Sequence, residues 1–140
     1  MASTHHYGTA AGAGAAPPDG FARLALKADG IVTGLNGLGY LALATVLEPF
    51  LGIGTSVHYA IGVFLVLYAA GVLVVGTRET INRTALGTVL VANLLWAALS
   101  VVTLFSGALS PTVAGEAWIV LQAVVVGLFA ELQYVGMKRM

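Results

Sequence analysis

Apolar residues gather into four long runs, separated by short links that are polar or contain Gly and Pro. The runs cover about residues 30–47, 57–75, 85–106 and 117–136. Each is about 18–22 residues long, which at ~1.5 Å per residue is enough to cross a hydrocarbon core of ~30 Å. The pattern predicts an all-α protein without sheet: a transmembrane four-helix bundle with up-down-up-down topology.

The segments outside the runs divide the chain into two parts. Residues 1–20 are rich in Gly, Ala, Ser, Thr and Pro and have no periodicity, so we expect a disordered tail over 1–22. Residues 23–140 form the predicted membrane domain. Its links are EPFLGIGTS (48–56), GTRETINRT (76–84) and SGALSPTVAGE (106–116).

Basic residues occur on one side of the predicted membrane only. They precede the first run, occupy the second link or end the chain: Arg23, Lys27, Arg78, Arg83, Lys138 and Arg139. The first and third links carry only Glu48 and Glu116 as charged residues. Because basic loops stay on the cytoplasmic side, we expect both termini in the cytoplasm and a multi-pass protein of the plasma membrane.

Composition agrees with this class. The chain is 59% hydrophobic and 9% charged, whereas a soluble domain carries about 25% charged residues. The excess of apolar residues predicts a surface in contact with the lipid bilayer. The net charge is zero, so nothing in it favours nucleic acid as a partner.

Chemistry-bearing motifs are absent from the sequence. There is no cysteine, and we find no HExxH, GxSxG or phosphate-binding glycine loop. His58 begins the second run without a second ligand on its side of the membrane, so we interpret it as an interfacial residue. We therefore predict no enzyme activity, no catalytic residue, no cofactor and no metal site.

Small residues repeat at helical spacing in two of the runs. Gly30, Gly34 and Gly37 share one stripe of the first, and Ala123 and Gly127 lie on one stripe of the fourth. Such stripes let membrane helices approach closely. The sequence therefore favours a protein that acts by helix association, as a homo-oligomer or as an accessory subunit of a membrane complex. It does not decide whether the stripes pack within one chain or between chains.

Polar residues also repeat along the first and third runs. Asp29, Thr33, Asn36 and Tyr40 share one face of the first, and Asn93, Trp96, Ser100 and Thr103 share one face of the third. Counted from the cytoplasmic ends of the runs, Asn36 and Asn93 reach similar depths. We therefore expect a polar cross-link between these two amides, with Tyr40 and Ser100 beside it.

An alternative interpretation makes the same residues a site. Asp29 and Glu131 would be the ionisable groups of a polar pocket that opens to the cytoplasm, with Trp96, Tyr68 and Gln122 around it. Ionisable residues inside spans are costly and commonly functional. The alternative function is a small transporter or ligand-binding module.

Four segments together carry a resemblance: ALKADGIVTGLNGLGYLALA, YAAGVLVVGTR, VANLLWAALSVV and LSPTVAGEAWIVLQAVVVGLFAELQY. They resemble a family of small four-span integral membrane proteins of high-GC Gram-positive bacteria. The resemblance covers about residues 21–140. Its recurring elements are Asp29, the Asn-x-x-Trp of Asn93 and Trp96, and the pair Gln122–Ala123. It implies a four-span membrane fold and carries over no activity or site residue.

Overall fold

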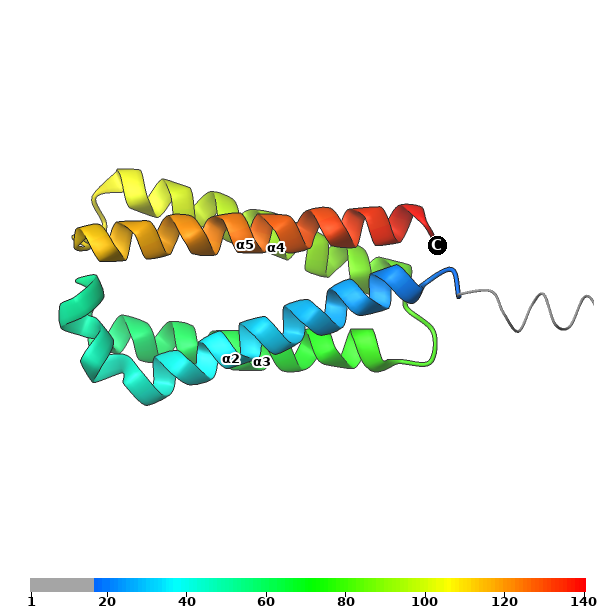
Figure 1. Cartoon of the computed structure of the whole chain (residues 1–140), viewed down its shortest axis with the longest axis horizontal. Coiled ribbons are helices and arrows are strands. Elements are labelled where there is room, and N and C mark those ends of the chain that lie inside the picture. The colour runs from blue at the N-terminus through cyan, green and yellow to red at the C-terminus, as the bar shows by residue number, and fades with distance from the viewer. Residues whose placement is uncertain (1–16) are drawn as a thin grey trace, which may run out of the picture.

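Four helices account for most of the chain in the computed structural model, which describes residues 17–140. They are α2 (Gly20–Leu51), α3 (Thr55–Thr77), α4 (Arg83–Ser106) and α5 (Val113–Lys138), with no strand among the described residues (Figure 1). This confirms the all-α class. Each helix is long and apolar enough to cross a membrane, which indicates a multi-pass membrane protein.

The first helix is longer at both ends than the sequence indicated. It begins at Gly20, so residues 20–22, which we had assigned to the tail, are helical, and Ala22 is fully buried. Residues 1–16 of the predicted tail lie outside the described residues. At its other end α2 continues through Pro49 to Leu51. Since proline removes one backbone hydrogen bond, α2 bends in its last turns (Figure 1).

Local sequence explains where the other helices begin and end. The side chains of Asn82 and Thr112 accept hydrogen bonds from the backbone of the first turns of α4 and α5, as N-capping residues do. Gly52 and Gly107 follow α2 and α4 with φ of 70° and 77°. Glycine adopts this left-handed conformation without steric cost, which ends the helix.

The helices pack as two pairs. α2 lies along α3 and α4 lies along α5, while α2 and α5 join the pairs and α3 barely touches α4. The first described residues and the C-terminus lie at one end of the bundle, which we call the terminal end; the α2–α3 and α4–α5 links lie at the other, the link end (Figure 1). The pairs are close at the terminal end and meet again at the link end, where the Thr112 amide donates to the Leu51 carbonyl oxygen.

The buried apolar core that the two pairs share lies at the terminal end. It consists of Ala22, Leu26, Val72, Ile81, Leu86 and Val89, with Met137 and Met140 against it. Gly136 permits the close approach of α5 to α2, and Gly76 permits that of α3 to α2. A Cβ on Gly136 would lie 2.6 Å from Ala22 Cα, and one on Gly76 would lie 3.0 Å from Leu26 Cβ.

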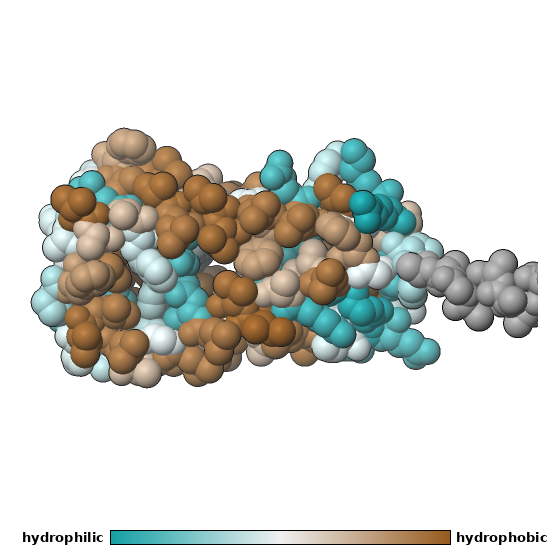
Figure 2. All heavy atoms as spheres, in the orientation of Figure 1, coloured by the Kyte–Doolittle hydropathy of each residue, from teal (hydrophilic) through white to brown (hydrophobic). Residues whose placement is uncertain are grey.

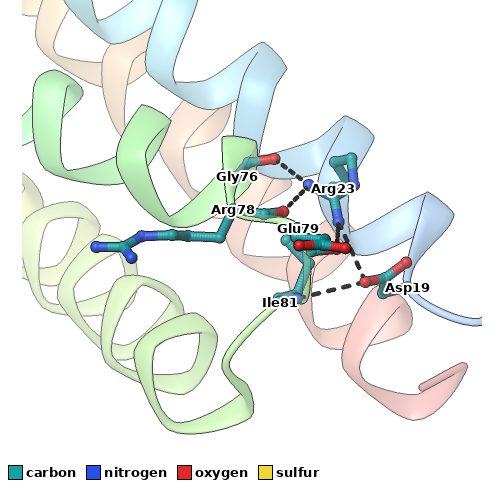
Figure 3. A network of polar contacts seen from close by, with 6 residues as sticks. All are labelled: Asp19, Arg23, Gly76, Arg78, Glu79 and Ile81. Atoms are coloured by element: carbon teal, nitrogen blue, oxygen red, sulfur yellow. Dashed lines mark hydrogen bonds and ion pairs between the residues drawn. The ribbon is translucent and has the colours of Figure 1, made fainter.

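Hydrogen bonds from Arg23 hold α2 to the end of α3 (Figure 3). Its guanidinium group donates to the carbonyl oxygens of Gly76 (2.8 Å), Arg78 (2.5 Å) and Glu79 (3.0 Å). Asp19 forms an ion pair with Arg23 at 3.3 Å and accepts from the amide of Ile81. These carbonyl groups have no partner within α3, so Arg23 satisfies the end of that helix.

The glycine stripe of α2 packs against α3 within the chain. A Cβ on Gly30 would lie 2.6 Å from Leu73, one on Gly34 would lie 3.4 Å from Ala69, and one on Gly37 would lie 3.0 Å from the Gly62 carbonyl oxygen. By contrast, a Cβ on Gly127 of α5 would have no neighbour within 4 Å. Gly127 therefore makes no close helix contact within the chain, and its packing between chains stays a prediction.

The outer surface is apolar, as expected of a lipid-facing protein. Hydrophobic side chains cover most of the face in Figure 2, and hydrophilic ones gather at the terminal end. The same view shows a hollow with hydrophilic side chains between the two helix pairs, nearer the link end.

Candidate functional site

Five polar side chains from all four helices meet inside the bundle, and we call them the Asp29 cluster: Asp29, Thr33, Tyr68, Asn93 and Gln133. Asp29 Oδ2 accepts from Asn93 Nδ2 (2.8 Å) and from Gln133 Nε2 (2.7 Å). Its other oxygen accepts from the Thr33 hydroxyl at 2.9 Å. Asn93 also donates to Gln133 Oε1 (3.0 Å), and its own oxygen accepts from the Tyr68 hydroxyl (3.1 Å).

The carboxyl group of Asp29 is the buried acid of this cluster. The residue is 1% exposed, and its partners Asn93 and Gln133 are 4% and 0% exposed. Its two oxygens accept three hydrogen bonds and donate none, which is the pattern of an ionised carboxylate. Among residues 17–140 the one salt bridge joins Arg23 to Asp19, so Asp29 has no salt-bridge partner there.

The predicted Asn36–Asn93 cross-link does not form. Asn36 instead donates to Gln122 Oε1 of α5 at 2.7 Å, whereas Asn93 bonds to Asp29 and Gln133. The sequence placed Asn36 and Asn93 at similar depths by counting from the ends of the apolar runs. This count was wrong because α2 begins earlier than its apolar run. Asp29 is the ninth residue after Gly20 and Asn93 the tenth after Arg83, so these two are level, about 13–15 Å along their helices.

An aromatic group lies between α2, α3 and α5 toward the link end. Trp118 Nε1 donates to the Tyr40 hydroxyl at 2.6 Å, and the Tyr40 ring meets the His58 ring edge-on at 5.2 Å. His58 is 2% exposed, and its Nδ1 lies 3.0 Å from the Gly54 carbonyl oxygen. It is therefore buried between helices in the first turn of α3.

A cavity of about 200 Å³ lies between the helix pairs beside these residues. We call it the larger cavity. Its polar lining comes from Asn36, Tyr40, Ser100, Thr103, Trp118 and Gln122, and its apolar lining includes Ile61, Leu65 and Leu99. At the link end, Thr112 donates from its amide to the Leu51 carbonyl oxygen at 3.0 Å, which joins the two pairs beyond the cavity.

A second cavity of about 50 Å³, the smaller cavity, connects this region with the Asp29 cluster. It shares Asn36, Trp96 and Gln122 with the larger cavity and reaches Thr33, Tyr68 and Asn93 of the cluster. Phe64 of α3 covers it on one side, stacked on Trp96 of α4 with ring centroids 5.5 Å apart. This stack joins α3 to α4, as does the hydrogen bond from Tyr68 to Asn93.

The structure brings together most, but not all, of the residues that the sequence proposed for a pocket. Asp29, Tyr68, Trp96 and Gln122 lie at or beside the cavities, whereas Glu131 is exposed and does not belong to them. The larger cavity also lies toward the link end, because Ile53 and Leu109 of the two links line it. This places the larger cavity away from the terminal end, at which the pocket was predicted to open.

Two other expectations need correction. Ser100 does not cross-link helices; its hydroxyl donates to the Trp96 carbonyl oxygen of its own helix at 2.8 Å. Gln133 was not proposed as a site residue, although the sequence placed it on the same face of the fourth run as Gln122. That shared polar face was the signal for it. Within residues 17–140, no three His, Asp or Glu side chains converge as metal ligands.

Comparison with known proteins adds no relative. No family model, no curated protein and no solved structure matches the chain. The function is therefore argued from the Asp29 cluster and the two cavities.

Proposed function

We propose that this protein binds a small amphiphilic molecule in the larger cavity, between its two helix pairs. The cavity itself is the observation that carries the proposal. Its volume of about 200 Å³ exceeds the ~150 Å³ of an engineered cavity that holds benzene. An apolar lining with a few polar groups is typical of small-molecule sites, and Asn36, Gln122 and Ser100 supply hydrogen-bonding groups here.

We propose further that the four helices cross the plasma membrane in up-down-up-down order, with both termini in the cytoplasm. The hydrogen bonds of Arg23 to the end of α3 and of Arg83 to the Met137 carbonyl oxygen support this. These bonds place Arg23 of α2 and Arg83 of α4 beside the ends of α3 and α5, at the terminal end. The larger cavity then lies in the outer half of the bundle, where an amphiphile dissolved in the bilayer reaches it.

Ligand binding can be followed with the two tryptophans of the chain, Trp96 and Trp118, because both line the larger cavity. Tribromoethanol is a compact neutral alcohol whose bromine atoms quench indole fluorescence on contact. We expect saturable quenching in purified protein in mild detergent. Ser100→Phe places a large side chain in the cavity. It should lower the apparent affinity for tribromoethanol about tenfold.

Val102→Phe is the matched control for this experiment. It adds the same side chain two residues away, where Val102 is 60% exposed on the outer surface. It should leave saturable quenching unchanged. Quenching that rises linearly with concentration and is equal in both variants would reflect partition into detergent, and would refute binding in the cavity.

Association with other copies or other membrane proteins is the second function that we propose. The α2 stripe no longer supports it, because Gly30 and Gly37 pack against α3. The observation in its favour is the open stripe at Gly127, which has no neighbour within 4 Å of its Cβ position. Crosslinking in native membranes should give discrete higher species, and Gly127→Leu should reduce them. A purely monomeric pattern would contradict association.

A further inference from the structure

Asp29 brings a negative charge close to the smaller cavity. The carboxylate has no salt-bridge partner among residues 17–140, and a carboxylate inside a membrane domain is costly unless a positive charge compensates it. The three hydrogen bonds that it accepts come from neutral groups. They stabilise the charge without cancelling it, so a cation placed nearby would be attracted.

The smaller cavity reaches two of the side chains that hold this charge. Thr33 and Asn93, which donate to the two carboxylate oxygens of Asp29, both line it. A group in this cavity is thus separated from the carboxylate by one side chain. Among the described residues that line either cavity none is Lys or Arg, so nothing basic there competes for Asp29 or holds an anion.

Aromatic rings also line the smaller cavity. Phe64 lies stacked between Tyr68 and Trp96, at centroid distances of 5.8 and 5.5 Å, and all three residues line the cavity. Tyr68 and Trp96, at the two ends of this near-parallel stack, each keep one ring face that Phe64 does not cover, and the faces of aromatic rings attract cations. The acid and the rings therefore favour the same sign of charge.

We propose that the site selects amphiphiles with a single positive charge, an ammonium group on a compact apolar body. The ammonium group occupies the smaller cavity between the aromatic residues and the Asp29 cluster. The apolar body occupies the larger cavity, which adjoins the smaller one at the side chains that line both, among them Asn36, Trp96 and Gln122. This inference rests on the proposed function and adds the class of ligand to it.

The test compares benzyltrimethylammonium with neopentylbenzene, a neutral molecule of nearly the same shape, as competitors of tribromoethanol. After correction for partition into detergent, the cation should displace the alcohol at about tenfold lower concentration. Asp29→Asn should reduce this preference to less than about twofold, while the quenching by tribromoethanol itself persists. That quenching also reports that the variant is folded.

Glu131→Gln is the matched control, because it removes one carboxylate from the exposed face of the same domain. It should keep the full preference for the cation. If Asp29→Asn does not fold, Phe64→Leu decides instead, because Phe64 is 49% exposed. Its loss should weaken binding of the cation several-fold and leave binding of the neutral competitor unchanged. Equal displacement by both competitors in the unmodified protein, with saturable quenching intact, would overturn the cation inference and leave the proposed function standing.

Discussion

Asn93→Leu should destabilise the folded protein by about 3 kcal/mol, the largest effect we expect of a single substitution. The leucine removes a donor to Asp29, a donor to Gln133 and the acceptor of the Tyr68 hydroxyl group. A buried polar group that loses its partner costs about 1–3 kcal/mol, and more if it is charged. Unfolding of the purified protein by titration with sodium dodecyl sulfate in mixed micelles measures the change.

Asn36→Leu is the control that separates this cluster from an ordinary contact between helices. Asn36 makes one side-chain hydrogen bond, to Gln122, so its loss should cost only about 1 kcal/mol. The two substitutions should add, since they share no partner. Asn93→Leu and Gln133→Leu should instead fail to add. A loss below 1 kcal/mol for Asn93→Leu would show that the Asp29 cluster does not form as described.

Gly136→Ala should destabilise the protein by about 2 kcal/mol, although alanine is the better helix former. The added Cβ would lie 2.6 Å from Ala22 Cα and 2.8 Å from the Ala22 amide nitrogen. These are backbone atoms of Ala22, which is itself fully buried, and backbone atoms within a helix cannot move aside as a flexible side chain can. The helix pairs must therefore separate at the terminal end, where their shared core lies. The same detergent titration measures the loss.

Gly127→Ala provides the opposite expectation on the same helix. No atom lies within 4 Å of its Cβ position, so the substitution should be neutral or stabilise the protein by up to ~1 kcal/mol through helix propensity. If both glycines gave the same change, close contact between α5 and α2 at Ala22 would be excluded.

The two stripes of small residues show what helical spacing can and cannot predict about helix packing. Gly30, Gly34 and Gly37 were predicted to pack a helix, and they do, against α3. The sequence did not name the partner, because a stripe shows which face is small and not what lies opposite. The same pattern at Gly127 meets no neighbour, whereas Gly115 makes the tightest approach, to the Leu51 carbonyl oxygen, and Gly136 approaches the Ala22 backbone. Both partners are distant in sequence.

The sequence by itself determined the helical class, the four apolar segments and the lipid-facing composition, because these depend on run length and on the scarcity of charge. It also pointed to Asp29, Asn93 and Trp96 as residues that matter. Only the tertiary structure decided that Asp29 meets Asn93 and Gln133, that Asn36 meets Gln122, and that Glu131 faces outward. The physical reason is the register between helices. It depends on where each helix begins and on which pairs are close, and a shift of about one turn, ~5.4 Å, changes every polar partner.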